Sequence, residues 1–181
     1  MNTTVNKLLI GFALSSFLVS CGGGGSEESA YDGRWITSPQ CEYDADNEEG
    51  VVVINEITGN SLTSDIKNYV TSDCSGSPIN KATLNYSLSY GDDKPSASSI
   101  CSNTREVDIE LTSGTINSID VPVTVLANKL DIDTEAYDLI CTNNNKIYFG
   151  DNEDDATDGT TAEKRPTVLD DEFYFVKEFK G

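Results

Sequence analysis

Hydrophobic and polar residues alternate along much of the chain with a period of two. The clearest run places hydrophobic side chains on one side of an extended segment: Ala82, Leu84, Tyr86, Leu88 and Tyr90. Such alternation is typical of a β-strand that buries one face and exposes the other to water. Three further rows share a face in the same way: Leu62, Ile66 and Val70; Val107, Ile109 and Leu111; and Phe173, Phe175 and Phe179. The pattern predicts an all-β fold.

Residues typical of tight turns separate these runs and predict hairpins. The turn sequences are Thr58-Gly59-Asn60, Ser113-Gly114 and Asn143-Asn144-Asn145. The strands between them include Val51–Ile57, Ile116–Val125, Tyr137–Thr142 and Lys146–Gly150. Pro122 cannot donate a ladder hydrogen bond, so the strand that contains it is expected to be an edge strand, bulged or short. Residues 127–136 are predicted to hold one or two helical turns.

The pattern gives eight or nine strands joined mostly by short connections. Consecutive antiparallel strands of this number either close into an up-and-down barrel or split into a two-sheet sandwich. Closure removes the unpaired edges that a sheet must otherwise protect. We therefore expect an antiparallel up-and-down barrel over residues 31–181.

The first residues have a different pattern, which is typical of a secretory signal peptide. Lys7 provides a positive charge, and Leu8–Val19 is a mostly apolar run of about 12 residues, which is too short to span a bilayer. Gly22-Gly23-Gly24-Gly25 follows within a polar segment that predicts a flexible tether. We expect a leader over residues 1–20 and a tether over residues 21–30.

The sequence Leu18-Val19-Ser20-Cys21 resembles the lipobox of bacterial lipoproteins. The resemblance implies cleavage before Cys21, which would then carry acyl chains such as palmitate on its sulfur and its amine. More than one acyl chain makes membrane anchoring stable. Because Gly22 rather than Asp follows the cysteine, the resemblance implies sorting to the outer membrane, with the periplasmic or the surface face left open.

The charge is strongly negative, with 31 acidic and 12 basic residues and a formal net charge of −19. A surface of this sign repels nucleic-acid phosphates and anionic lipid headgroups, so a nucleic-acid partner is disfavoured. It suits a solvated exterior or the capture of cations.

Five cysteines divide into Cys21 and four others, namely Cys41, Cys74, Cys101 and Cys141. An even number in an exported chain indicates two disulfides. No pair has the short spacing of zinc ligands, and the chain has no histidine. Three pairings are possible, of which we expect Cys41–Cys74 and Cys101–Cys141, the neighbours in sequence.

The first strand begins with Gly33-Arg34-Trp35, which resembles the Gly-x-Trp signature of lipocalins and related calycins. The resemblance implies an eight-stranded barrel in which Trp35 plugs the closed end and Gly33 allows close chain packing. Lipocalins place an arginine late in the barrel against this tryptophan, whereas the late cations here are Lys177 and Lys180.

The chain also resembles small lipoproteins of unassigned role from marine gammaproteobacteria. The shared features are the Gly-x-Trp start with a cysteine soon after it, a tyrosine shortly before Cys74, Phe149-Gly150-Asp151, and a following Arg165-Pro166.

Catalytic signals are weak. The absence of histidine excludes Ser-His-Asp and Cys-His nucleophile activation. Paired carboxylates can hydrolyse glycosides, but 31 acidic residues give that signal no specificity. Two acidic clusters supply oxygens suited to calcium: Asp44, Asp46, Glu48 and Glu49, and Asp151, Glu153, Asp154, Asp155 and Asp158. Neither has the EF-hand spacing, so we expect solvated loops, no metal, no cofactor and no enzymatic activity.

By analogy with lipocalins, the first functional hypothesis is binding of a small apolar ligand in the barrel mouth. Strand parity gives five candidate ligand-binding residues: Tyr86, Tyr90, Tyr148, Phe173 and Phe175. Residues 151–171 form a long connection that could cover one mouth. The alternative is an envelope interaction protein with a side-chain-filled barrel. A cavity of roughly 300 Å3 or more favours a ligand, and a packed interior with an exposed apolar patch favours a protein partner.

The lipid anchor makes a direct prediction. Replacement of Cys21 by Ser removes the acylated sulfur, so the protein should move from the membrane fraction into a soluble fraction. Fractionation of cells that express each form measures this, and a Cys21→Ser protein that stays in the membrane would contradict the anchor.

Overall fold

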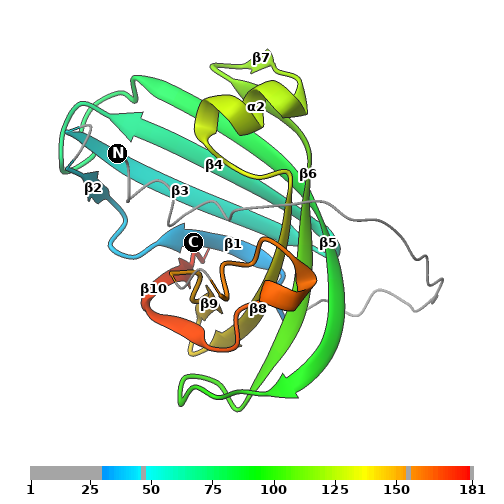
Figure 1. Cartoon of the computed structure of the whole chain (residues 1–181). Helices are drawn as coiled ribbons and strands as arrows, with labels where there is room; N and C mark the ends of the chain where they lie inside the picture. The colour runs from blue at the N-terminus through cyan, green and yellow to red at the C-terminus, as the bar shows by residue number, and fades with distance from the viewer. Residues whose placement is uncertain (1–29, 46–47, 154–155, 180–181) are drawn as a thin grey trace.

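The computed structural model describes residues 30–45, 48–153 and 156–179, and within them the chain is almost entirely β-structure (Figure 1). The strands are β1 (Gly33–Thr37), β2 (Glu42–Asp44), β3 (Glu49–Thr58), β4 (Ser61–Tyr69), β5 (Asn80–Pro95), β6 (Asn103–Ile116), β7 (Ile119–Asp120), β8 (Glu135–Asn143), β9 (Lys146–Gly150) and β10 (Leu169–Lys177). The helical elements are α2 (Val123–Leu130) and the short 3₁₀ helix η1 (Ala162–Lys164).

Eight of these strands close into an antiparallel barrel, as the sequence predicted. Their order is β1-β10-β9-β8-β6-β5-β4-β3, and β3 pairs back onto β1. The short strands β2 and β7 extend the sheet by pairing with β3 and β6. Closure leaves no open edge among the eight barrel strands, because each has a partner on both sides.

The period-two alternation decides which side chains fill the barrel. Leu62 and Ile66 of β4, like Leu84 and Leu88 of β5, are buried in the main core cluster, while the residues of opposite parity between them are partly exposed: Thr63, Asp65, Asn85 and Ser87. Val70 and Phe179 were expected to continue such rows. They lie beyond the ends of β4 and β10, and each is 68% exposed. Both residues have the same parity as the inward residues of their strands, but the strands end before they are reached.

Trp35 occupies the barrel end at which β1 begins. It is 1% exposed, and its indole N–H donates to the carbonyl of Tyr31 at 2.9 Å. The ammonium of Lys177 lies over its ring, 5.2 Å from the centroid, and donates to the carbonyl of Asp32 at 2.9 Å. A cation on an aromatic face is favourable by ~0.5–2 kcal/mol. The lysine therefore occupies the place in which the lipocalin resemblance implies an arginine.

Gly33 makes this arrangement possible. Its φ of +147° is a conformation that residues with a Cβ rarely adopt, and a Cβ at this position would lie 2.7 Å from Cε of Lys177. The spacing of Gly33 and Trp35 thus has a physical explanation, because the glycine leaves the space through which Lys177 reaches the indole.

The opposite end of the barrel differs from the prediction. Ser113-Gly114 is not a turn, since β6 continues through it to Ile116. The turn lies at Asn117 and Ser118, which both have positive φ, and it leads into β7. The predicted Ile116–Val125 strand is therefore wrong: the turn interrupts it, and beyond Asp120 it is replaced by α2, whose first turn follows Pro122, where a missing N–H costs nothing.

Gly114 serves close packing instead of turning. A Cβ there would lie 2.9 Å from Cδ1 of Leu126 and 2.7 Å from the carbonyl of Thr83. Leu126 is fully buried in the core cluster, so α2 covers this end of the barrel through one anchored side chain (Figure 1). A glycine inside a strand has this meaning as often as it marks a turn.

Both predicted disulfides are present. Cys41–Cys74 joins the segment before β2 to the β4–β5 connection, and Cys101–Cys141 joins the β5–β6 connection to β8. The sequence separations are 33 and 40 residues, which correspond to about 4 kcal/mol each in the loop-entropy treatment of the unfolded chain.

The predicted leader and Cys21 lie outside the described residues. Within the residues that are described, no helix has the length and apolar character needed to cross a bilayer.

The Gly33 contact gives a prediction for stability. Gly33→Ala should lower the free energy of unfolding by about 2 kcal/mol, through the positive φ and the clash with Lys177. In a Lys177→Ala background the same change should cost less, because the clash is gone and only the backbone strain remains. Urea unfolding of the four proteins in this cycle measures the difference. An equal cost in both backgrounds would show that Lys177 does not restrict position 33.

Candidate functional site

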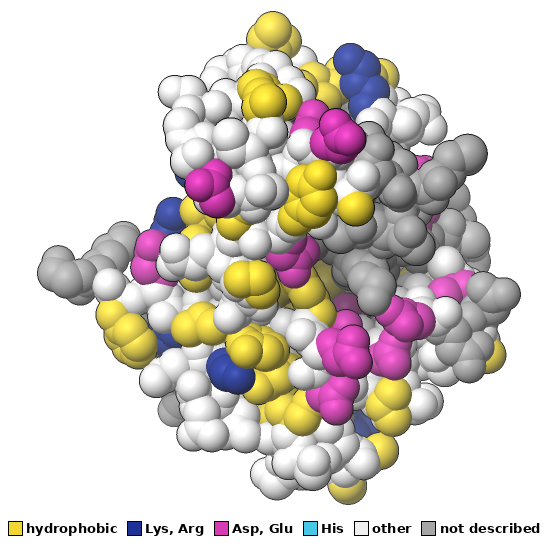
Figure 2. Space-filling view, turned by 90° about the vertical axis from the view of Figure 1, so that its left-hand side faces the viewer, with side chains coloured by type: hydrophobic (Ala, Val, Ile, Leu, Met, Phe, Trp, Pro, Cys, Tyr) yellow, Lys and Arg dark blue, Asp and Glu magenta, His cyan; other side chains and the backbone are white. Residues whose placement is uncertain are grey.

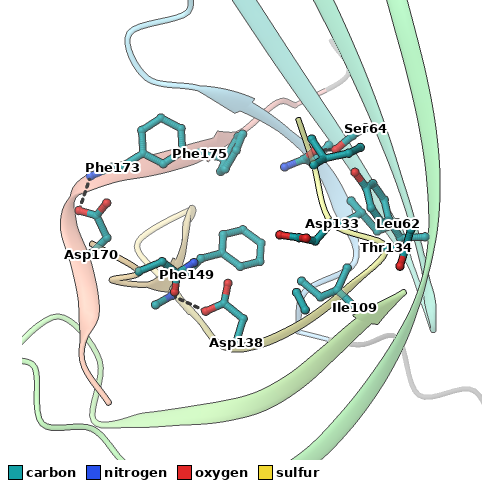
Figure 3. Close-up of a pocket in the computed structure, with 16 residues that line it drawn as sticks. Leu62, Ser64, Ile109, Asp133, Thr134, Asp138, Phe149, Asp170, Phe173 and Phe175 are labelled. Carbon is teal, nitrogen blue, oxygen red and sulfur yellow. Dashed lines mark hydrogen bonds between the residues drawn. The ribbon is translucent and has the colours of Figure 1, made fainter. Parts of the chain in front are cut away.

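A cavity of about 80 Å3 lies inside the barrel and is partly open to solvent (Figure 3). Its walls come from seven barrel strands, from the segment between α2 and β8, and from the residue Asn152 after β9. The lining residues are Asn55, Leu62, Ser64, Tyr86, Ile109, Ile132, Asp133, Thr134, Ala136, Asp138, Phe149, Gly150, Asn152, Asp170, Phe173 and Phe175. Phenylalanine and aliphatic side chains make up the apolar part of this wall, and carboxylates, amides and hydroxyls make up the rest.

Three of the five residues chosen by strand parity line this cavity: Tyr86, Phe173 and Phe175. Phe173 and Phe175 contact each other edge to face, with ring centroids 5.2 Å apart, and Phe175 contacts Phe149 in the same way at 6.1 Å. The three phenylalanines therefore form one connected aromatic wall, contributed by β9 and β10 (Figure 3).

Tyr148 and Tyr90 do not line the cavity. In β9 the inward residues are Ile147 and Phe149, so Tyr148 points outward and packs with Leu139 and Leu169 in a separate cluster. Tyr90 faces inward but lies near the Trp35 end, where its ring stacks on Tyr31 at 5.4 Å. The parity of a five-residue strand such as β9 is ambiguous, because both of its faces carry hydrophobic residues.

Three buried side-chain oxygens have no hydrogen-bond partner in the described part of the chain. They are Tyr86 Oη, Asp138 Oδ2 and Asn152 Oδ1, and all three belong to residues that line this cavity. A buried polar atom without a partner costs about 1–3 kcal/mol, so native proteins rarely leave several in one place. Their concentration here marks the cavity as a place where a ligand or bound water supplies hydrogen bonds.

Asp138 is the charged group at the centre of the site. It is 1% exposed and occupies an inward position of β8, between Ala136 and Ile140. Its Oδ1 accepts from the backbone N–H of Leu139 at 2.6 Å and from that of Gly150 at 2.8 Å, while Oδ2 has no partner. Burial raises the pKa of Asp138 to about 7, against the opposing effects of the two N–H donors and of Arg165.

The motifs that the sequence analysis singled out near the C-terminus converge on Asp138. Phe149 lines the cavity and Gly150 donates to the carboxylate, and a Cβ on Gly150 would lie 2.6 Å from Oδ1. Arg165 donates from Nη1 to the carbonyl of Asp138 at 2.8 Å, and Pro166 packs over Gly150. These residues hold the position and the hydrogen bonds of a single carboxylate.

Arg165 also fixes the long connection between β9 and β10. Its guanidinium donates to the carbonyl of Val107 at 3.0 Å and to the carboxylate of Asp108 at 2.6 Å, both on β6. Farther along the connection, Asp158 accepts from Thr160 and from Lys164. The described part of this segment is thus pinned to the barrel wall and has its own internal hydrogen bonds.

The cavity is acidic. Asp133, Asp138 and Asp170 line it, and among the described residues no Lys or Arg side chain does. Asp170 is bound locally, since its Oδ1 accepts from the backbone N–H groups of Glu172 and Phe173. On the face that Figure 2 shows, acidic side chains also cover more of the surface than basic ones.

The polar side chains that line the cavity and carry no charge include Asn55, Ser64 and Tyr86. Ser64 donates to Oδ1 of Asn55 across the β3–β4 pair. Burial raises the pKa of Tyr86, so its hydroxyl stays protonated near neutral pH.

The calcium clusters are not assembled in the described part of the chain. There, no group of three or more acidic or cysteine side chains is placed to hold a metal ion. Asp158 pairs with Lys164, Asp44 is buried in β2, and Asp46, Asp154 and Asp155 lie outside the described residues.

Sequence reasoning missed Asp138 and Asn152. Asp138 had a detectable signal, because it shares its parity with Ile140 in the predicted Tyr137–Thr142 strand, which puts the carboxylate on the same face as a hydrophobic residue. Asn152 had none, since it follows a strand within an acidic loop.

No protein-family model matches the chain, and no curated protein matches it. Its function is therefore argued from the cavity.

The raised pKa of Asp138 predicts a pH-dependent stability. Between pH 4 and 7 the folded protein keeps a proton on Asp138 that the unfolded chain has lost, so its contribution to stability falls as the pH rises. The free energy of unfolding of the wild type, relative to Asp138→Asn, should therefore decrease by up to about 4 kcal/mol from pH 4 to pH 8. Asparagine can retain both hydrogen bonds to the backbone, so the variant should fold. Urea unfolding at several pH values measures this, and parallel curves for the two proteins would contradict it.

Proposed function

We propose that this protein binds a small molecule inside its barrel and that it does so as a lipid-anchored protein of the outer membrane. The observation that supports binding is the set of unpartnered oxygens of Tyr86, Asp138 and Asn152 around one cavity. Side chains that only fill a barrel interior leave few such atoms, because each one lowers stability. A ligand that donates hydrogen bonds satisfies them.

The cavity volume limits the size of the bound group. About 80 Å3 is below the volume of roughly 300 Å3 that was expected to favour a ligand, and below the 300–1,000 Å3 typical of pockets for drug-sized ligands, so the proposal of binding rests on the unpartnered oxygens and not on the volume. The cavity holds a group of roughly five to eight non-hydrogen atoms, if each occupies about the space of a water molecule. The proposed ligand is therefore small, or it places one end in the cavity and the remainder at the opening.

The proposed location rests on the sequence. The leader, the resemblance of Leu18-Val19-Ser20-Cys21 to a lipobox and the glycine after Cys21 support an acylated N-terminus at the outer membrane. The two disulfides of the barrel fit an oxidising compartment outside the cytoplasm. Binding is proposed without catalysis, because a chain without histidine lacks the usual base for a serine or cysteine nucleophile.

A second candidate is an interaction with another envelope protein. The connections around the α2 end of the barrel expose Val70 at 68%, Ile79 at 45% and Ile119 at 69%. Exposed apolar residues that gather at one end can bind a protein partner.

Native mass spectrometry distinguishes the two candidates. Protein extracted from its own membrane should carry a small non-covalent mass. Ala136→Leu adds three carbons to the cavity wall and should remove that mass, whereas Val125→Leu on the exposed side of α2 should retain it. Melting temperatures close to the wild type would show that both variants fold. A wild-type protein that carries another protein and no small molecule would favour the second candidate.

A further inference from the structure

The unpartnered oxygens specify the hydrogen-bonding character of the missing group. Asp138 Oδ2, when ionised, and Asn152 Oδ1 can only accept hydrogen bonds, and Tyr86 Oη can accept one as well. The complementary group is a donor with several N–H or O–H bonds. An ammonium group has three donors and no acceptor, so it can satisfy three acceptors at once.

The charge of the cavity also favours an ammonium group. Asp138 is 1% exposed, and its companions on the cavity wall include Asp133 and Asp170. Arg165 lies outside this wall and bonds to the backbone carbonyl of Asp138 and to Asp108, so it gives the Asp138 carboxylate no direct hydrogen bond. An ionised carboxylate in an apolar interior is unfavourable unless a cation pairs with it.

The remaining wall is suited to an apolar body. Phe149, Phe173 and Phe175 form a connected aromatic wall, and Ile109 and Leu62 lie on the opposite side, with the carboxylates of Asp133 and Asp138 directed into the space between (Figure 3). Aromatic faces also attract organic cations.

We infer that the ligand is a small primary amine with an apolar body, whose ammonium group binds Asp138. This inference rests on the proposed binding function and deepens it. The ammonium replaces the missing hydrogen-bond donors and neutralises the buried charge, while the body of the molecule lies against the phenylalanines.

Titration of Asp138 makes binding dependent on pH. The groups that surround it are Tyr86 on β5, Asp133 before β8, Asp170 on β10, and Arg165 on the β9–β10 connection. The carboxylate is largely protonated below its pKa of about 7. Amine affinity should therefore rise between pH 6 and pH 8, where the pKa of an alkyl ammonium, near that of lysine, still keeps the ligand charged.

The test compares two probes of the same shape, benzylamine and benzyl alcohol, by titration calorimetry of the full-length protein in detergent at pH 8. Benzylamine should bind the wild type at least about tenfold more tightly, which corresponds to one strong charge-assisted contact. Asp138→Asn should lose that preference and bind benzyl alcohol as the wild type does. Near pH 7, benzylamine binding should also release protons from Asp138, and buffers of different ionisation enthalpy detect this release.

A matched control removes one carboxylate elsewhere. Glu110→Gln changes an exposed residue on β6 and lowers the net negative charge by the same amount, so it should leave the preference for benzylamine intact. A preference that Glu110→Gln also loses would show general attraction of cations by the acidic surface, and would overturn the inference.

The other outcomes separate this inference from the function on which it rests. Equal affinity for both probes, or a co-purifying molecule without a basic nitrogen, would overturn the amine inference and leave small-molecule binding standing. Failure of both probes to bind, together with the absence of any co-purifying small mass, would overturn both.

Discussion

The pairing of β1 with two partners is the constraint on which the rest of the structure depends. Three residues of β1 pair with β10 on one side and four pair with β3 on the other, so β1 and β10 close the sheet. This closure gives every inward residue a fixed position around a common interior. It also brings Lys177 at the end of β10 onto Trp35, and Gly33 permits that contact because it lacks a Cβ. Without closure, the residues of the cavity would lie on an open surface and Asp138 would be solvated.

The architecture followed from the alternation of side chains because a buried face forces that pattern on each strand. The ends of the strands could not be predicted from the alternation, because Gly114 and Pro122 are each compatible with two different local structures. A glycine can permit a turn or the close approach of another element, and the contact of Gly114 with Leu126 is visible only in three dimensions. Proline can break a strand or begin a helix. The choice of Tyr148 failed for a similar reason, because Cys101–Cys141 and its neighbours build a second apolar cluster on the outside of β8 and β9.

The site was less predictable than the fold because Asp138 does not follow the hydrophobic alternation from which the fold was predicted. Alternation identifies inward positions by their hydrophobicity, whereas Asp138 is inward and ionisable. Proteins depart from local consistency mainly at functional or strained positions. The neighbouring residues compensate for this departure only in part: Leu139 and Gly150 bind one carboxylate oxygen, and the other is left without a partner. A purely structural carboxylate would be expected to have both oxygens satisfied, as the general scarcity of buried unpaired atoms indicates.

Rigidity around Asp138 bears on how such a site could select its ligand. The carboxylate is held by backbone N–H groups of β8 and β9, and the strand that carries it is held from outside by Arg165, which bonds to β6 as well. A carboxylate fixed in this way cannot turn toward solvent to recover its hydration, so any stabilisation of its charge beyond that from the two backbone N–H groups and Arg165 comes from a group that enters the cavity. Pre-organisation of this kind favours small ligands, because a fixed carboxylate loses little conformational entropy on binding. The small volume of the cavity and the high cost of its empty, ionised state are therefore two aspects of one arrangement, in which the proposed recognition depends on a single buried charge.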